Sequence, residues 1–333
     1  MYKRQPSIPL KASCSALCNN LDVSDANSSQ SGGSLTFAVV HKSVSHLINS
    51  SPGLPHIYRQ VTCKESGTTQ TSTSSSITQS SWCALESRKV LVIASLKGIQ
   101  MFEPDGSIML FWHALNRSDE KTAQFARGIT SIKSDNLVCV GTSSGSILIF
   151  SVDDNGKVLN IQLKETLSGH DVPITDLISG ESDTLASADE LGNIAIWKTS
   201  DKSISKVTLI KGQNYPCSSI RLWDKYIIGG YGSGHIRIYE ANTGNLEIEI
   251  AAHARWVNAI DVAFEANLLL SASEDTYVRV WSLGLVDNKL KVEMKFSESV
   301  TDVQLQGCKF TSPEGLTFAL TGYDFSEIYL FSR

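Results

Sequence analysis

The stretch GTSSG, residues 141 to 145, matches the G-x-S-x-G motif that presents a nucleophilic serine in many hydrolases. That chemistry requires a sharp turn from a strand into a helix, because this turn holds the serine strained and exposed. Here a second strand-like stretch, Ile147 to Phe150, follows at once. The context is that of a hairpin, so the motif is interpreted as an ordinary turn without a catalytic residue.

Two further patterns could carry chemistry, and both have simpler explanations. GGYGSG, residues 229 to 234, looks like a phosphate-binding loop, but HIRIY at 235 to 239 has strand character where a helix N-terminus is needed. Glycine also serves tight turns that need positive φ. The seven histidines do not cluster at metal-ligand spacing. We therefore expect no metal and no cofactor.

Composition restricts the remaining classes of function. The 333 residues are 41% hydrophobic and carry a net charge of −5, with no long basic run, which argues against nucleic-acid binding. No apolar stretch is long enough for a signal peptide or a membrane span, so direct membrane insertion is not expected. The seven cysteines are odd in number and scattered. This usage predicts a reduced, cytoplasmic protein, for which association with membranes or vesicles through partners remains open.

The elements that would position any site form a repeat. An apolar strand, a tight turn and a second strand ending in an aromatic residue recur at separations of 48, 47, 42, 42 and 50 residues. The closing aromatic residues are Phe102, Phe150, Trp197, Tyr239, Trp281 and Phe331. No stretch of comparable length has the pattern of an amphipathic helix, so the sequence predicts an all-β fold.

Two more units complete the pattern: a divergent first unit, and a last unit whose strands come from both ends of the chain. Residues 34 to 50 fit the first hairpin, with Leu17 to Leu21 as its innermost strand and Ile57 to Val61 as its outermost strand. The chain ends just after the third strand of the last unit. We therefore expect Ser7 to Leu10 to pair beside Ser326 to Phe331, because this pairing removes two exposed strand edges. Seven four-stranded units follow.

The stretch AAHARWVNAIDVAFEANLLLSASEDTYVRVWSL, residues 251 to 283, resembles a WD repeat, one blade of a β-propeller. From residue 7 to the C-terminus the chain is similar to one vertebrate branch of the WD-repeat β-propeller family, most weakly over residues 22 to 80. The similar stretches include ALCNNL (16–21), GIQMFE (98–103), FARGI (125–129), YEANTGNL (239–246) and TGYDFSEI (321–328). This resemblance implies a single seven-bladed propeller, residues 1–333, acting as a cytoplasmic interaction module without catalytic residues.

In that family a His, a Ser, a turn Asp and a Trp form a buried relay of hydrogen bonds that holds a blade together. The resemblance assigns this structural relay to His253, Ser271, Asp275 and Trp281. A second set lacks the acid, because Leu191 stands at the turn position; it consists of His170, Ser187 and Trp197. The turn positions of other blades hold Ser144, Ser233 and Phe325. We therefore expect one complete relay.

Recognition residues tend to lie in loops on a rigid scaffold, and on a propeller the loops before the first strand and after the second strand share one face. Arg, Trp and Tyr are enriched in binding hot spots. The candidate binding residues are Arg255, Trp256, Tyr215, Asp171, Glu274, Tyr231, Arg127 and Tyr323. Each one taken singly fits loop packing between blades, so the prediction depends on the cluster. It suits a peptide or protein partner with a basic or amide-rich side chain.

Two classes of function remain open. The first is a non-enzymatic scaffold that binds protein partners, with self-association left open. The alternative is a propeller hydrolase or metal-dependent enzyme, for which Asp176 and Asp261 on the innermost strands are the main channel candidates. Two segments, 22 to 34 and 64 to 80, are rich in Ser, Thr, Asn and Gly, so we expect them to be mobile loops. For the second segment, an inert linker is favoured over a phosphorylated docking loop.

Overall fold

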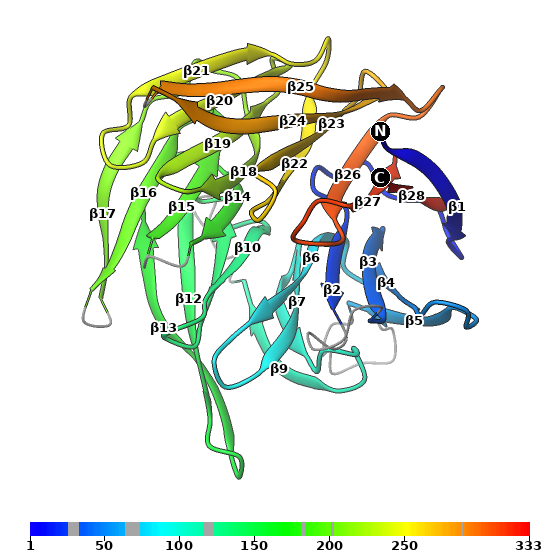
Figure 1. Ribbon diagram of the computed structural model, residues 1–333. Helices are drawn as coiled ribbons and strands as arrows, with labels where there is room; N and C mark the ends of the chain where they lie inside the picture. Colours follow the sequence, from blue (N-terminus) through cyan, green and yellow to red (C-terminus); the bar gives the residue numbers. More distant parts are fainter. Residues whose placement is uncertain (26–32, 64–73, 116–122, 181–183, 201–202, 288) are drawn as a thin grey trace. The chain divides into compact units, whose positions relative to one another are not determined.

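The computed structural model describes residues 1–333 except 26–32, 64–73, 116–122, 181–183, 201–202 and 288 (Figure 1). The described residues form seven four-stranded sheets and contain no helix. Seven such sheets are the blades of a seven-bladed β-propeller, so the all-β prediction is confirmed. The chain divides into two compact units, and the first comprises Met1–Leu21, Glu190–Ile194 and Thr208–Arg333. The second unit comprises Asp22–Asp189 and Ala195–Val207.

Blades 1 to 3, and most of blade 4, belong to unit 2. Blade 1 consists of β2 (Asp22–Asp25), β3 (Leu35–His41), β4 (Val44–Ser50) and β5 (Ile57–Thr62). Blade 2 consists of β6 (Ile77–Ala84), β7 (Lys89–Ser95), β8 (Gly98–Phe102) and β9 (Met109–Ala114). Blade 3 consists of β10 (Ala126–Ile132), β11 (Leu137–Thr142), β12 (Ser146–Asp154) and β13 (Leu159–Ser168). Blade 4 consists of β14 (Ile174–Ser179), β15 (Thr184–Asp189), β16 (Ile194–Ser200) and β17 (Ser203–Ile210).

Blades 5 to 7 belong to unit 1. Blade 5 consists of β18 (Cys217–Trp223), β19 (Tyr226–Tyr231), β20 (His235–Glu240) and β21 (Leu246–Ala251). Blade 6 consists of β22 (Val257–Ala263), β23 (Leu268–Ser273), β24 (Tyr277–Val286) and β25 (Lys289–Ser299). Blade 7 consists of β26 (Leu305–Phe310), β27 (Thr317–Gly322), β28 (Glu327–Ser332) and β1 (Lys3–Pro9).

The burial of each strand follows its place in the blade. Every residue of β23 is buried, because neighbouring blades cover both faces of a central strand. The outermost strand β25 instead alternates between half-buried and exposed residues along most of its length. Its outward charges form ion pairs, in which Glu293 lies 2.6 Å from the ammonium groups of both Lys291 and Lys295. Charged side chains on an edge strand discourage pairing with another chain.

The N-terminal strand completes the last blade, as predicted. β1 pairs antiparallel with β28, from Lys3 opposite Ser332 to Pro9 opposite Glu327 (Figure 1). The N–H of Leu10 extends the pairing by donating to the Ser326 carbonyl, at 2.8 Å. The strand begins at Lys3, four residues before the predicted start. β1 therefore covers the edge of β28 that would otherwise be open.

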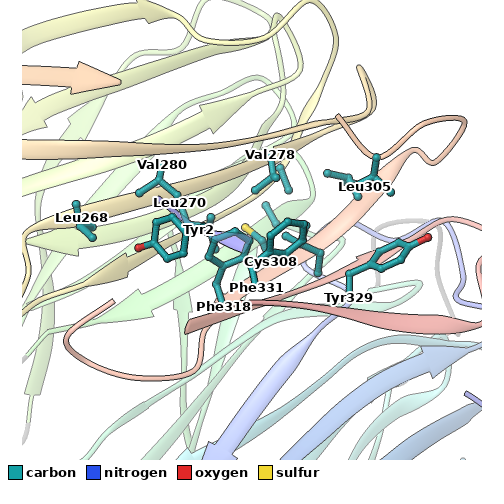
Figure 2. Close-up of a cluster of buried hydrophobic side chains, with 14 of the residues drawn as sticks. Tyr2, Leu268, Leu270, Val278, Val280, Leu305, Cys308, Phe318, Tyr329 and Phe331 are labelled. Carbon is teal, nitrogen blue, oxygen red and sulfur yellow. The ribbon is translucent and has the colours of Figure 1, made fainter. Parts of the chain in front are cut away.

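Aromatic rings fix this closure in the core (Figure 2). Tyr2 is 5% exposed, and its ring centroid lies 4.9 Å from that of Phe318. Phe318 stacks on Phe331 with ring centroids 4.8 Å apart. The Tyr2 hydroxyl donates to the carbonyl of Gly315, so the polar end of this buried side chain is satisfied. The N-terminus is therefore anchored by packing as well as by strand pairing.

The expected arrangement of blade 1 and of the two loops is wrong in part. Residues 17 to 21 are not a strand, and the innermost strand of blade 1 is β2, Asp22–Asp25. This polar strand is stabilised by hydrogen bonds, because the Asp22 carboxylate accepts from the Ser81 hydroxyl and the Trp82 N–H at 2.7 and 2.8 Å. Likewise, Ile77–Ser80 lies within β6. The remaining parts of the predicted loops at 26–32 and 64–73 lie outside the described residues.

Candidate functional site

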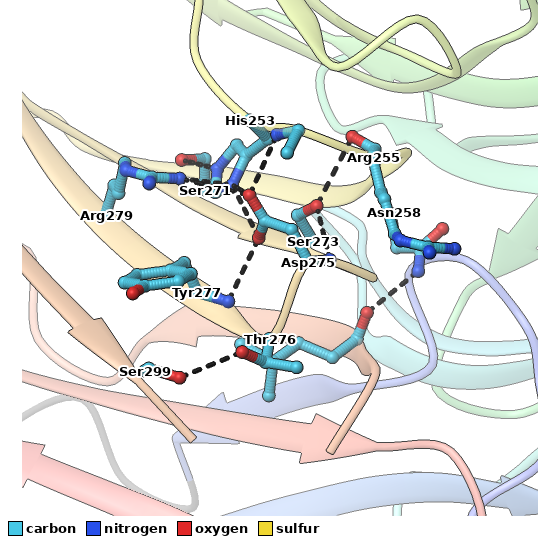
Figure 3. Close-up of polar contacts among 12 residues, drawn as sticks. His253, Arg255, Asn258, Ser271, Ser273, Asp275, Thr276, Tyr277, Arg279 and Ser299 are labelled. Atoms are coloured by element: carbon cyan, nitrogen blue, oxygen red, sulfur yellow. Dashed lines mark hydrogen bonds and ion pairs between the residues drawn. The ribbon is translucent and has the colours of Figure 1, made fainter. Parts of the chain in front are cut away.

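The predicted relay of blade 6 is present and complete (Figure 3). The Trp281 indole N–H donates to Ser271 Oγ at 3.0 Å, and Ser271 Oγ lies 2.8 Å from His253 Nε2. His253 Nδ1 lies 3.0 and 3.1 Å from the two carboxylate oxygens of Asp275. In the tautomer with its proton on Nδ1, the ring donates to Asp275 and accepts from the Ser271 hydroxyl at Nε2, and Arg279 Nη1 lies 2.7 Å from Nδ1. The chain of bonds joins β23 and β24 to the loop before β22 and to the turn after β23, so its role is structural.

Electrostatics support this neutral imidazole. Burial lowers the pKa of His253, which outweighs the opposing effect of Asp275. For Asp275, burial alone would raise the pKa, but hydrogen bonds from His253 and from the N–H groups of Ala254 and Tyr277 hold it well below its usual value. The carboxylate is therefore charged and the imidazole neutral near pH 7. Arg279 Nη1 lies 3.3 Å from Asp275 Oδ2 and balances its charge.

A second complete relay occurs in blade 4, which corrects the prediction of one. The Trp197 indole N–H donates to Ser187 Oγ at 3.0 Å, and Ser187 Oγ lies 2.6 Å from His170 Nε2. The acid is Asp189, whose Oδ2 lies 2.8 Å from His170 Nδ1. Asp189 ends β15, two residues after the serine, whereas the pattern of the repeat places the acid at Leu191 in the turn. The side chains of His170 and Asp189 are 0% and 1% exposed.

Tyr231 is not a surface residue, so its prediction as a binding residue is wrong. It ends β19 and is 0% exposed. Its hydroxyl lies 3.2 Å from that of Tyr239, and the Arg237 guanidinium lies 4.6 Å from its ring centroid. Blade 5 has neither the relay histidine nor the relay tryptophan. Tyr231 on the second strand, and Arg237 and Tyr239 on the third strand, take the place of the relay. Tyr231 therefore belongs to the core of blade 5.

The other candidates of unit 1 lie at one end of the strands. Antiparallel pairing places the residue before a first strand beside the residue after the second strand. In blade 6 the N–H of Glu274 donates to the carbonyl of Trp256 at 3.1 Å. In blade 5 the N–H of Gly232 donates to the carbonyl of Pro216 at 2.9 Å. These residues therefore lie at the same end of each blade. We call this end, where the first strand begins and the second strand ends, the loop end.

Hydrogen bonds between blades align the loop ends of unit 1. Ser218 Oγ, in the second residue of β18, donates to the carbonyl of Val257, the first residue of β22. The Asn258 side-chain amide donates to the carbonyl of Leu305, the first residue of β26, at 2.8 Å. The first strands of blades 5, 6 and 7 thus start side by side. Their loop ends form one surface of unit 1.

Exposed aromatic side chains lie in the loops at these loop ends. Tyr215 and Tyr323 are each 51% exposed, and Trp256 is 39% exposed. The Trp256 ring lies against Gly232, where an added Cβ would come within 3.0 to 3.1 Å of ring atoms. Glycine at this position lets the indole lie flat on the backbone of the neighbouring blade. Arg255 is exposed beside Trp256, and Glu274 is half-buried opposite it.

The remaining candidates give a mixed result. Leu191 is 42% exposed at the turn between β15 and β16, within unit 1, and sequence reasoning missed it as a surface residue. Its carbonyl accepts from the N–H of Asn214 at 3.2 Å, next to Tyr215. In unit 2, Asp171 is exposed in the loop before β14. Arg127 lies within strand β10 and is half-buried, so its placement in a loop is wrong.

The patterns that suggested chemistry have structural roles. GTSSG spans the end of β11 and the turn to β12, and the Ser143 hydroxyl accepts from the backbone N–H of Gln124 at 2.6 Å. Asp261 on β22 lies 3.1 Å from Arg221 Nε and 3.5 Å from Lys309 Nζ, so its charge is balanced by two cations. Asp176 is buried. The described ranges contain no group of three or more His, Cys, Asp or Glu side chains arranged to hold a metal ion.

Within the described part of the chain, no helix is long and apolar enough to cross a membrane. All seven cysteines are free thiols, and six of them are buried. Burial raises the pKa of Cys14 and of Cys139, each to about 12, which keeps both thiols protonated.

Comparisons with known proteins agree with this geometry. The family model described as WDR54 matches residues 1–333. The chain is 41% identical over 344 aligned positions to WD repeat-containing protein 54 of Mus musculus, covering 99% of both chains. The Homo sapiens protein of the same name is also 41% identical, over 100% of this chain and 99% of the relative.

Solved structures show the same fold at low sequence identity. A chain from the crystal structure of the mitotic checkpoint complex superposes with a TM-score of 0.72 and 14% identity, covering 99% of this chain and 92% of that one. The RRP9 WD40 repeats superpose with a TM-score of 0.73 and 13% identity, covering 99% of each chain. Propellers of this family generally act as protein-interaction scaffolds. Since the family model spans the whole chain, the protein belongs to the WDR54 family of WD-repeat β-propellers.

Proposed function

We propose that this propeller is a non-enzymatic scaffold that binds a protein or peptide partner at the loop end of unit 1. The observation that carries the proposal is the exposure of Tyr215, Trp256 and Tyr323 at the loop ends of three successive blades. Large aromatic side chains supply binding energy with few rotatable bonds, and Trp and Tyr are enriched in hot spots. The binding surface comprises Tyr215, Arg255, Trp256, Glu274 and Tyr323.

The charges on this surface suggest the chemistry of the partner. Trp256 follows the exposed Arg255, and its carbonyl accepts from the N–H of the half-buried Glu274, whose carboxylate can accept from a basic or amide side chain. An exposed indole also suits a guanidinium group through a cation–π contact. We therefore expect a segment with an Arg, Lys, Asn or Gln side chain placed over Trp256. The free thiols support a reducing compartment such as the cytoplasm.

The rigidity of the surface supports binding without rearrangement. Trp256 rests on Gly232, and the carbonyl of Trp256 accepts from the N–H of Glu274. Ser273 Oγ lies 3.3 Å from the Arg255 carbonyl and holds the same loop. A preorganised site loses less conformational entropy on binding, so more of the contact energy appears as affinity.

The proposal is tested by titrating an isolated partner against wild type, Tyr215→Ala, Trp256→Ala and Arg255→Ala, with thermal unfolding measured in parallel. Removal of a hot-spot side chain should weaken binding by about 2 kcal/mol or more. Phe264→Ala is the matched control, because Phe264 is 60% exposed and follows β22 at the opposite end of blade 6. If the three loop-end variants fold and bind as wild type does, partner binding uses another surface.

A further inference from the structure

The segment between β1 and β2 is largely buried although it is not part of a strand. We call residues Cys14–Leu21 the connector; it lies in unit 1, before the innermost strand of blade 1. It has no regular strand, yet Cys14, Asn20 and Leu21 are only 2%, 4% and 2% exposed. Asn19 has a φ of 57°, a left-handed conformation that asparagine tolerates better than most residues. An irregular segment with such burial is held by specific contacts.

The first set of contacts joins the connector to the innermost strands of blades 5 and 6. The Asn19 side-chain amide donates to the carbonyl of Ser218 at 3.2 Å, and the Ser219 hydroxyl donates to Asn19 Oδ1 at 2.9 Å. The backbone N–H of Asn19 donates to the carbonyl of Asn258 at 3.1 Å. The Cys18 thiol lies 3.3 Å from Asn258 Oδ1. Side-chain and backbone groups of the connector therefore both form hydrogen bonds at the loop ends of β18 and β22.

The second set of contacts joins the connector to blade 7. The N–H of Asn20 donates to the carbonyl of Gln306 at 3.3 Å, and Thr321 Oγ1 donates to the carbonyl of Asn20 at 3.0 Å. Close packing accompanies these bonds, because a Cβ added to Gly307 would come within 2.7 Å of Leu21 Cβ. The connector thus reaches the innermost strand of each of three successive blades.

The connector also holds the turn that carries Tyr323. Cys14 and Tyr323 form a parallel bridge. The N–H of Cys14 donates to the carbonyl of Phe325, and the N–H of Asp324 donates to the carbonyl of Cys14, both at 3.0 Å. Asp324 has a φ of 52°, so this turn adopts a left-handed conformation that the two bonds help to fix. One end of the connector therefore positions an exposed aromatic residue.

We propose that the connector is a built-in ligand of unit 1, which occupies the loop ends of β18, β22 and β26. The polar groups that a ligand would use there, at Ser218, Asn258 and Gln306, already bind Asn19 and Asn20. The occupant that fits the remaining surface is a protein segment lying across the connector and the exposed aromatic side chains. This inference deepens the proposed function.

Cys14 provides a direct measurement, because its thiol is buried in the seated connector and should become exposed if the connector leaves. The parent protein for the test is Cys18→Ser, which removes the half-buried thiol of the connector and keeps a donor for Asn258. A small aromatic disulfide reagent labels the folded protein, and mass spectrometry of its peptides gives the rate at Cys14. Asn19→Gly removes the side-chain bonds but tolerates the left-handed backbone. Asn214→Gly is the control, because Asn214 is also left-handed, with a φ of 61°.

We expect Cys14 in the folded parent to react at least about 100-fold more slowly than in denaturant, since an exposed thiolate is the reactive form. Asn19→Gly should raise that rate about tenfold or more, and Asn214→Gly should leave it unchanged, because only Asn19 bonds with the innermost strands. If Asn19→Gly unfolds the protein, Ser219→Ala removes one of the same bonds and should raise the rate likewise. Labelling of the folded parent as fast as the unfolded chain would overturn the proposal, as would equal rates in all variants. No partner is needed, so this result is independent of the proposed function.

Discussion

The blade 4 relay offers the sharpest test of how the repeat is held together. Asp189 and His170 are both fully buried, and the Nδ1-to-Oδ2 distance is 2.8 Å. Asp189→Ala removes a charge-assisted bond and leaves the imidazole N–H without this buried acceptor. Such changes cost about 3 kcal/mol of unfolding free energy. Asp189→Asn keeps an acceptor oxygen and should cost less, about 1 to 2 kcal/mol.

The corresponding change in melting temperature can be estimated from chain length. The entropy of unfolding is about 2.1 cal/mol/K per residue, so a chain of 333 residues has about 0.7 kcal/mol/K. A loss of about 3 kcal/mol then lowers the melting temperature by about 4 °C for a single cooperative transition. Urea unfolding gives the free energy directly and also shows, through the slope, whether the transition stays cooperative.

Leu191→Ala is the matched control for Asp189→Ala, because position 191 is where the repeat pattern places the acid. Leu191 is 42% exposed, so its truncation should change the free energy of unfolding by about 0.5 kcal/mol or less. Asp275→Ala serves as the reference for a relay acid in blade 6. If Asp189→Ala is as stable as wild type while Asp275→Ala loses about 3 kcal/mol, the blade 4 relay does not stabilise the fold.

Three further predictions concern the core and its pH dependence. Trp281→Ala should lower the free energy of unfolding by about 3–5 kcal/mol. Trp281→Phe should lower it clearly less, since the phenyl ring fills much of the space but cannot donate to Ser271. Equal stability of wild type and both variants in urea would refute this. Tyr2→Ala should lower the free energy of unfolding by about 3 kcal/mol, measured by thermal unfolding. Tyr277→Ala should lower it less, because Tyr277 is partly exposed. Burial lowers the pKa of His253, so the unfolded chain binds the proton more tightly, and stability should fall as the pH drops through about 6.5. Urea titrations at pH 5 to 7 should show a smaller decrease in His253→Gln; an identical decrease would contradict the assignment.

The sequence predicts the repeat well, because strand and turn patterns are local. The hairpins, their closing aromatic residues and the pairing of the N-terminus with β28 follow from spacing and from the need to cover strand edges. The position of the acid in the blade 4 relay does not follow from spacing. Asp189 ends a strand, and only the three-dimensional path of β15 shows that its carboxylate reaches His170.

The surface was harder to predict, for two physical reasons. Residue type indicates binding tendency but not burial, so Tyr231 looked similar to Tyr215 although only the latter is exposed. The connector depends on contacts between residues about 200 positions apart, such as Asn19 with Ser219, and no local pattern encodes them.

Site-specific cross-linking tests the proposed binding surface most directly. A photoreactive amino acid is placed at Tyr323 or Tyr215, and in a separate protein at Phe264, which is equally accessible but lies at the opposite end of the strands. We predict that an isolated partner cross-links from the two tyrosine positions and not from position 264. Cross-linking from position 264 alone, with all three proteins folded, would contradict partner binding at the loop end of unit 1.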